Sequence, residues 1–239
     1  MSCGLFVTGT DTGVGKTIVT AALAIALRRR GLCVGVMKPA ESGCPLEQGQ
    51  LSPQDALFLK EMSGCAAPLT LINPYRLAQA LTPALAAEHE GVVIDLDHIR
   101  DCYDQLAAMH DIVLVEGAGG LLAPLIDRSS MRDLAVRLEL PLLVVARNVL
   151  GVINHTALTV TVARQTSAVL GVVLNNSVPI EQAAEQSNAA ALRRWGGAPL
   201  LGQIPYSAAL SRDYIELLGA ELDVAAILQA VPASKNSER

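Results

Sequence analysis

The chain has 239 residues, a mass of 25.1 kDa, a hydrophobic fraction of 51% and a mean hydropathy of +0.38. No uninterrupted apolar run reaches the roughly 18 residues that a membrane-spanning helix requires, so the apolar excess indicates strands that helices bury on both faces. The formal net charge of −5 and the isoelectric point near 5.4 disfavour broad binding to nucleic acid or anionic lipid, because the field of the whole molecule attracts neither.

The first predicted elements are a strand at residues 5–7 and a helix at residues 18–27, joined by a glycine-rich segment. That segment, residues 9–17, reads Gly-Thr-Asp-Thr-Gly-Val-Gly-Lys-Thr. Gly13 and Gly15 allow a tight turn whose N–H groups point into one concavity, and the N-terminus of the helix faces the same point. We therefore interpret the segment as a phosphate loop.

Two side chains of this loop are candidates for nucleotide binding. Lys16 would reach the outer phosphates, and the Thr17 hydroxyl would be a ligand of the bridging magnesium. The usual spacing places a glycine at position 10, whereas this chain has Thr10 and carries Gly9 instead, so the loop is a variant. The alternative interpretation is a strand-to-helix turn with a surface lysine.

A second buried strand is predicted at residues 33–37, and it ends directly in Lys38. Parallel α/β sheets place their chemistry at the carboxyl ends of strands, which favours a functional Lys38 over a surface lysine. After a loop at residues 44–54, a helix is predicted to begin with Ser52 as N-cap and with Asp55 in its first turn. Asp55 then either complements the helix dipole or binds metal, and spacing alone does not decide between these roles.

Residues 66–87 contain several helix breakers and resemble an excursion from the sheet. Residues 94–109 are predicted as a strand end and a helix with Asp97 as N-cap. The apolar strand predicted at residues 112–115 ends in Glu116 and a run of glycines. A carboxylate at this point suits a magnesium or phosphate-side role, and the alternative is a solvated turn carboxylate.

Three more strands are predicted at residues 141–146, 169–174 and 199–204, with helices at residues 153–166 and 180–195. The chain thus has about seven strands alternating with helices. This pattern predicts an α/β fold with a doubly wound, mostly parallel sheet of the phosphate-loop NTPase type. The length favours a single domain over residues 1–239, with a frayed tail at 233–239.

Asn175 and Asn176 follow one of these strands, where amides either read a base or form a turn. The four histidines show no ligand spacing. The five cysteines are odd in number and lack metal-like pair spacing, which favours free thiols in a reducing compartment. Since the start of the chain carries no signal-peptide pattern, we expect a cytoplasmic protein.

The order and spacing of these motifs resemble the dethiobiotin synthetase family nearly from end to end. The resemblance is carried by residues 7–12, 14–17, 38–39, 42–43, 55, 73–75, 115–120, 150–151, 153–155 and 204–205. It implies a homodimer that acts on 7,8-diaminononanoate, carbon dioxide or bicarbonate, and magnesium ATP. In this family a substrate amine is carbamylated and the carbamate attacks the γ-phosphate. The second amine then closes the ureido ring on the carbamic-phosphoric anhydride, releasing ADP and phosphate.

The resemblance also implies roles for individual residues. The expected magnesium ligands are Thr17, Asp55 and Glu116. The expected catalytic residues are Lys38, Lys16 and Thr12. The expected ATP-binding residues are Gly13, Val14, Gly15, Lys16, Thr17, Ile18, Asp55, Glu116, Gly117, Ala118, Gly119, Asn175, Asn176, Pro205 and Tyr206, of which the last four face the base. The expected substrate-binding residues are Thr12, Lys38 and Ser42, with Leu150, Gly151 and Asn154 reaching from the partner subunit.

Two departures from the family pattern concern Gly13, where some relatives carry an acidic residue, and Arg147, which stands where small or uncharged residues are familiar. Two other function classes are alternatives for a chain with such a loop. A cobyrinic or cobyric acid synthase would need an additional glutaminase domain, for which 239 residues leave no room. A partner-switching ATPase of the partitioning or positioning type would carry a second lysine near the start of the loop, and this loop has none.

Overall fold

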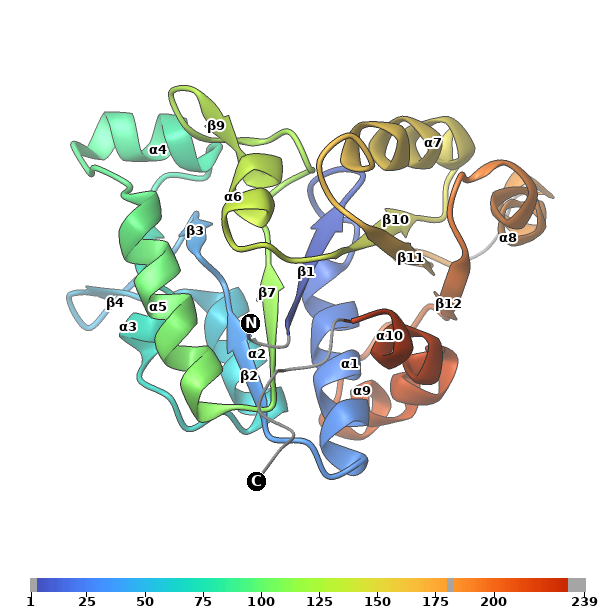
Figure 1. Ribbon diagram of the computed structural model, residues 1–239, viewed down its shortest axis with the longest axis horizontal. Coiled ribbons are helices and arrows are strands. Elements are labelled where there is room, and N and C mark those ends of the chain that lie inside the picture. Colours follow the sequence, from blue (N-terminus) through green and yellow to red (C-terminus); the bar gives the residue numbers. More distant parts are fainter. Residues whose placement is uncertain (1–3, 180–182, 232–239) are drawn as a thin grey trace.

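The computed structural model of the chain describes residues 4–179 and 183–231. Its main feature is a six-stranded sheet with the order β12-β11-β10-β1-β7-β2, in which all neighbouring strands are parallel (Figure 1). The strands are β1 (Gly4–Gly9), β2 (Val34–Met37), β7 (Ile112–Glu116), β10 (Leu142–Arg147), β11 (Val169–Asn175) and β12 (Leu200–Ile204). The predicted α/β fold with a mostly parallel sheet is confirmed.

Helices cover both faces of this sheet, and others lie beside the short strands outside it. The helices of the described residues are α1 (Lys16–Arg29), α2 (Gln54–Ser63), α3 (Leu69–Ile72), α4 (Pro83–Glu90), α5 (Leu96–Met109), α6 (Met131–Arg137), α7 (Val152–Ala163), α8 (Ala183–Trp195), α9 (Arg212–Leu218) and α10 (Val224–Ala230), with a 3-10 turn at Gly219–Glu221. Helix α1 packs against α2, α9 and α10 on one face, whereas α5 contacts β2 and β7 and α7 contacts β10 and β11 on the other (Figure 1). The strand order runs from β1 toward β2 in one direction and toward β12 in the other, and right-handed crossovers, the rule for parallel strands, then place helices on opposite faces.

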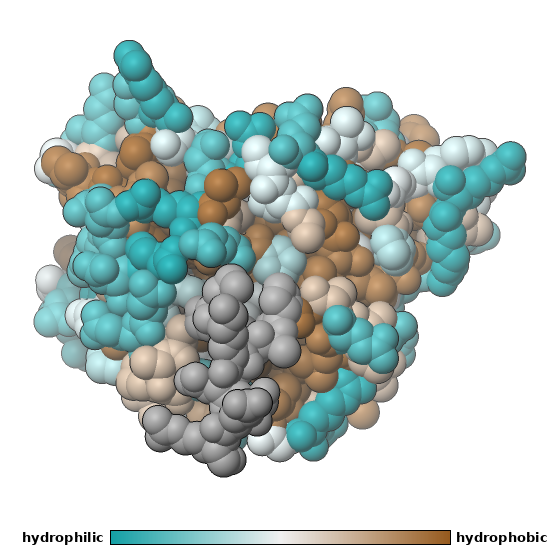
Figure 2. Space-filling model, in the orientation of Figure 1, coloured by the Kyte–Doolittle hydropathy of each residue, from teal (hydrophilic) through white to brown (hydrophobic). Residues whose placement is uncertain are grey.

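Burial on both faces explains the composition of the strands. Every residue of β1, β2 and β7 is buried, so these strands are continuous apolar runs rather than alternating ones. Helix α5 instead buries one stripe, formed by Ile99, Cys102, Tyr103 and Leu106. Its polar side chains face outward, and they are visible as hydrophilic surface at the left of Figure 2, where Figure 1 places α5. Among the described residues no helix is both long and apolar enough to cross a membrane.

The segments outside the main sheet contain more regular structure than the sequence indicated. Short strands pair as β3 (Ala40–Ser42) with β6 (Tyr75–Leu77), β4 (Leu46–Glu47) with β5 (Gln50–Leu51), and β8 (Pro124–Ile126) with β9 (Ser129–Ser130). The expected loop at residues 44–54 is therefore a small hairpin. The expected excursion at residues 66–87 holds α3, β6 and the start of α4.

Two predicted helix caps and one predicted strand end are wrong. The N-cap of α5 is Asp95, whose side chain accepts a hydrogen bond from the N–H of Asp97. Ser52 does not cap α2, which begins after Pro53 without a local side-chain cap. Ile94 has no strand partner, and its buried side chain joins the core instead. The tail predicted at residues 233–239 lies outside the described residues.

Candidate active site

A cavity of about 650 Å³ opens at the carboxyl edge of the sheet, beside β1. Strand β1 lies between β7 and β10, so the chain leaves it in one direction toward β2 and returns later on the other side. Such a switch point leaves a crevice in doubly wound folds. The cavity is lined by Thr12, Gly13, Gly15, Lys16, Thr17, Ile18, Lys38, Glu41, Ser42, Gln54, Asp55, Phe58, Glu116, Ala118, Gly119 and Leu210.

The glycine-rich loop forms the floor between β1 and α1. Gly13 and Gly15 have φ angles of 68° and 96°, in the left-handed region that glycine adopts without steric cost. The loop's entry is fixed to the sheet by the N–H of Thr10, which donates to the Val145 carbonyl at 3.0 Å. Helix α1 begins at Lys16, so its N-terminal N–H groups and dipole are directed at the cavity. The predicted strand, loop and helix are all present.

Lys16 is a buried cation on the cavity wall. Its Nζ lies 3.4 Å from the Asp11 carbonyl, and the residue is 6% exposed. Burial and the neighbouring charge of Lys38 lower the pKa of Lys16 to about 8, although Glu116 opposes this shift. Lys16 is thus mostly charged at neutral pH and lies in a site that favours an anionic partner.

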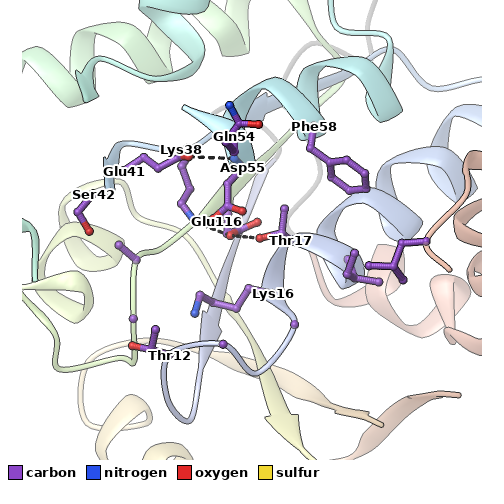
Figure 3. Close-up of a pocket in the computed structure, with 16 residues that line it drawn as sticks. Thr12, Lys16, Thr17, Lys38, Glu41, Ser42, Gln54, Asp55, Phe58 and Glu116 are labelled. Atoms are coloured by element: carbon purple, nitrogen blue, oxygen red, sulfur yellow. Dashed lines mark hydrogen bonds and ion pairs between the residues drawn. The ribbon is translucent and has the colours of Figure 1, made fainter. Parts of the chain in front are cut away.

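Lys38 joins two carboxylates from different elements (Figure 3). Its Nζ donates to Glu116 Oε1 at 2.5 Å and to Asp55 Oδ2 at 2.8 Å. Burial disfavours the charged form of Lys38, but the two carboxylates outweigh it, so the net effect is a raised pKa. Asp55 is also partly buried, yet Lys38 and Thr17 hold its pKa below the usual range.

Glu116 is the point on which the side chains converge. It is fully buried at the end of β7, and its Oε1 accepts from both Lys38 Nζ and Thr17 Oγ1, the latter at 2.9 Å. Its Oε2 has no hydrogen-bond partner among the described residues, which is costly for a buried carboxylate oxygen. The structure therefore brings Thr17, Lys38, Asp55 and Glu116 together, although they come from four separate segments.

Comparison with known proteins decides which phosphate-loop family this site belongs to. A family model described as an AAA domain matches residues 3–213. Curated relatives named ATP-dependent dethiobiotin synthetase BioD include one from Anaeromyxobacter sp. (strain K), 46% identical over 92% of this chain and 98% of that relative. Another, from Thermodesulfovibrio yellowstonii, is 38% identical over 90% of this chain and 93% of the relative. The chain belongs to the dethiobiotin synthetase family. The resemblance predicted from its motifs is confirmed.

Solved structures agree on the fold of this chain but come from more distant proteins. The septum site-determining protein MinD from Pyrococcus horikoshii, complexed with Mg-ADP, has a TM-score of 0.58 at 17% identity and covers 95% of each chain. A ParA family ATPase from Chlorobium tepidum has a TM-score of 0.53 at 14% identity, with 96% of this chain and 93% of that chain covered. At such low identity these matches show the fold alone, and they do not favour the partner-switching alternative.

Glu41 lines this cavity, and sequence reasoning missed it. Its carboxylate accepts the N–H groups of Asp55 at 2.9 Å and Ala56 at 3.0 Å, so it caps α2 from β3 in place of the expected Ser52. Burial raises the pKa of Glu41, although these hydrogen bonds oppose the shift. The position of Glu41 just after Lys38 is the feature of the sequence that could have placed it near the cavity, but it does not indicate the capping role. Capping from another element depends on tertiary contact and is invisible in local spacing.

The residues expected to contact the base and the substrate's far end do not line this cavity. Asn175 Nδ2 donates to the Val14 carbonyl at 2.9 Å, and Asn176 Oδ1 accepts from Asn148 Nδ2 at 2.7 Å. The Pro205 carbonyl accepts from Tyr214 Oη at 2.9 Å. The other expected residues outside the lining are Val14, Gly117, Leu150, Gly151, Asn154 and Tyr206. Gln54, Phe58 and Leu210 line it without having been predicted.

Proposed function

We propose that this chain is an ATP-dependent dethiobiotin synthetase. It carboxylates 7,8-diaminononanoate with carbon dioxide and closes the ureido ring through a carbamate and a carbamic-phosphoric anhydride, releasing ADP and phosphate. The observation that carries the proposal is the convergence of Lys16, Lys38 and Thr17 with two carboxylates in one cavity, in a chain up to 46% identical to proteins of that name.

The phosphate loop binds the triphosphate of ATP. In this proposal the N–H groups of the loop and of the first turn of α1, residues 13–18, surround the phosphate oxygens, and Lys16 contributes a charge beside them. Residues 116–119 form the wall on the other side of the cavity, with Ala118 and Gly119 in its lining. Glycine at position 119 has a φ of 65° and allows the ligand to approach the backbone closely.

The site also fits a magnesium ion held by Thr17, Asp55 and Glu116. Magnesium prefers hard oxygen ligands, and these residues supply a hydroxyl and two carboxylates, including the unpartnered Glu116 Oε2. Within the described residues no cluster of three or more histidine, cysteine or acidic side chains has the geometry of a metal site. Nucleotide phosphates and water would therefore complete the coordination, as is usual for magnesium. The ion would neutralise charge on the β- and γ-phosphates.

The chain's own residues position and neutralise the reacting groups. Phosphoryl transfer requires in-line geometry and compensation of developing negative charge more than an acid–base pair. Lys16 and Lys38 supply cations from two sides of the cavity, and Thr12 and Ser42 offer hydroxyls to the carbamate (Figure 3). The ion pairs with Asp55 and Glu116 keep Lys38 protonated, so it acts as a fixed charge rather than as a base.

The remaining assignments concern the dimer, the base and the compartment. Leu150 is 78% exposed, and Gly151 and Asn154 beside it at the start of α7 are also exposed, so these three residues are suited to reach a partner subunit's substrate. We propose a homodimer on this basis. The base is assigned to Asn175, Asn176, Pro205 and Tyr206, of which Tyr206 is 41% exposed. Free thiols at the four described cysteines fit a reducing compartment such as the cytoplasm.

Incubation of the protein with diaminononanoate, labelled bicarbonate and magnesium ATP tests the proposed function. The expected result is an acid-stable labelled product whose formation requires all three compounds, because a carbamate alone decomposes in acid whereas the closed ring does not. ATP hydrolysis that is independent of diaminononanoate, without any acid-stable label, would show that the protein is not a dethiobiotin synthetase and would favour a nucleotide-dependent switch.

A further inference from the structure

The chain leaves the main sheet just before Lys38. Strand β2 lies at one edge of the six-stranded sheet, and its register with β7 ends at Met37, which is opposite Val115. The residue after Lys38 is Pro39, which has no N–H to donate. The ladder between β2 and β7 therefore does not hold the backbone of Lys38, although the ammonium of this residue reaches two carboxylates.

Two consecutive residues at the end of α3 bind both backbone polar groups of Lys38 instead. The Lys38 N–H donates to the Ile72 carbonyl at 2.7 Å, and the Lys38 carbonyl accepts from Asn73 Nδ2 at 2.6 Å. Asn73 is followed by Pro74, which disfavours helical backbone at the residue before it, and Asn73 accordingly ends α3 with φ of −138° and ψ of 85°. This turn places the end of α3 against Lys38.

The two ends of the Asn73 amide have partners of opposite kind. Its Nδ2 donates to the Lys38 carbonyl and, at 3.3 Å, to the Tyr75 carbonyl, whereas its Oδ1 accepts from Arg76 Nε at 3.3 Å. Arg76 Nη2 also donates to the main-chain carbonyl of Asn73 at 2.9 Å, which holds the guanidinium beside the amide. Asn73 is fully buried, so an apolar or acidic side chain of similar size would leave some of these groups unpaired.

We propose that Asn73 is a positioning residue for the catalytic cation Lys38. Lysine has a flexible four-carbon side chain, so its ammonium has one position only when both ends of the side chain are held. The two carboxylates hold the ammonium end, and the groups of Ile72 and Asn73 hold the backbone end. Asn73 does not line the cavity formed by the described residues, so it acts through Lys38 rather than on the substrate.

A purely structural role for Asn73 makes a different prediction. The Asn73 N–H donates to the Leu69 carbonyl at 2.8 Å, and the Asn73 amide also stabilises the turn from α3 into β6. If these contacts were its whole role, replacing Asn73 would lower the free energy of unfolding and leave kcat of the folded protein unchanged. The positioning role, which rests on the proposed role of Lys38 in phosphoryl transfer, lowers kcat of the folded protein. It leaves the affinity for magnesium ATP unchanged, because the phosphate loop follows another strand.

Asn73→Leu tests the positioning role, because leucine is similar in size but has no donor for the Lys38 carbonyl. We expect kcat to fall by about 10- to 100-fold, since displacing a reacting group by about 1 Å costs up to about 100-fold. Formation of acid-stable label from bicarbonate measures kcat, and calorimetric titration with magnesium ATP should give an unchanged dissociation constant. Circular dichroism and urea unfolding check that the variant is folded.

A double-mutant cycle tests whether the effect depends on Lys38. In the Lys38→Ala background there is no ammonium to position, so Asn73→Leu should lower kcat no further. Label accumulated over long incubations measures the low residual turnover of both variants. If the two losses multiply in full, Asn73 affects turnover by another route, and the proposal is overturned.

Two further variants complete the test. Tyr75→Phe is the matched control in the same segment: it removes the hydroxyl that accepts the Asp95 N–H at 2.8 Å but keeps the Tyr75 carbonyl that accepts from Asn73. Its stability should fall while its kcat stays unchanged. Arg76→Met removes the donor to the Asn73 Oδ1, and because Arg76 is only partly buried this variant should fold even if Asn73→Leu does not. Its kcat should fall severalfold.

An unchanged kcat in folded Asn73→Leu would overturn the positioning role. An equal loss of kcat in Tyr75→Phe would overturn it too, because the effect would then come from general destabilisation. If Asn73→Leu does not fold, an unchanged kcat in Arg76→Met overturns the proposal. A wild-type protein that forms no acid-stable product would refute the proposed function and the positioning role with it, whereas an active wild type with an equally active Asn73→Leu would refute the positioning role alone.

Discussion

Replacing Lys38 with alanine tests the centre of the site. The Lys38 side chain is only 5% exposed and contacts Glu116 and Asp55, so its removal leaves the fully buried Glu116 without its strongest partner. Breaking a buried ion pair in this way costs about 3–5 kcal/mol. A domain typically has about 5–15 kcal/mol of stability, so we expect Lys38→Ala to fold but to unfold at lower urea concentration.

Turnover should fall much further than nucleotide affinity in Lys38→Ala. In the proposed mechanism the phosphate-binding N–H groups belong to the loop after β1, whereas Lys38 follows β2 and is assigned to the reacting groups. Losing one well-placed stabilising charge costs on the order of 100-fold in turnover, or about 2.7 kcal/mol of transition-state stabilisation. Formation of acid-stable label from bicarbonate measures turnover, and calorimetry measures ATP affinity.

Lys60→Ala is the matched control. Lys60 lies on α2 outside the cavity lining, and its replacement removes only a hydrogen bond from Lys60 Nζ to the Ala67 carbonyl. It should keep near-normal turnover. The double variant Lys38→Ala/Glu116→Gln removes the buried uncompensated charge, so it should regain stability without regaining turnover. Near-normal turnover in Lys38→Ala would refute the role of Lys38 as a catalytic cation.

Three further predictions concern other parts of the site. Because Lys16 must be protonated to attract phosphate and its pKa is about 8, ATP affinity should fall as pH rises above 8; proton uptake on binding, measured by calorimetry in buffers of different ionisation enthalpy, checks this. Glu41→Ala should lower the free energy of unfolding by about 1–2 kcal/mol and raise the magnesium requirement of turnover, since it uncaps α2 beside Asp55; urea unfolding and magnesium titration measure both. Leu150→Glu should make the protein monomeric in sedimentation velocity without altering its unfolding, because Leu150 is 78% exposed.

Each of these predictions has a contrary outcome. A pH-independent ATP affinity between pH 7 and about 10, near the ordinary pKa of lysine, would exclude Lys16 as the titrating group. Glu41→Gln keeps an acceptor and serves as the control for Glu41→Ala, so equal losses in the two variants would argue against capping. Leu217→Glu, a change at a residue 67% exposed on α9, controls for Leu150→Glu; a variant of Leu150 that remains dimeric would contradict the proposed interface.

The parts of the site that could be predicted are those that local sequence encodes. Lys38 and Glu116 each follow a short apolar run, and parallel strands bring such positions to one edge whatever their order in the sheet. The same holds for Lys16 and Thr17, which follow the glycines directly. Position relative to a strand end is therefore a strong signal.

The parts that could not be predicted depend on which strands are neighbours. Glu41 caps a helix in another segment, and Arg147 and Asn175 donate to carbonyls of the phosphate loop only because β10 lies next to β1 and β11 next to β10. Nothing in the spacing of these residues states that order. For Asn175 the sequence left base contact and turn formation open, and its bond to Val14 became visible only with the strand register.

The strand order also has a consequence for synthesis of the chain. Strand β1 is translated before the other strands of the main sheet but lies in its middle, with Phe6 in register with Leu142 of β10 and Val115 of β7. Since synthesis proceeds at about 5–20 residues per second, β1 would wait for several seconds before both of its neighbouring strands have been synthesised. During that interval the apolar strand and the unfolded loop after it are exposed, so the nascent chain is a potential chaperone substrate until residue 147 has left the exit tunnel.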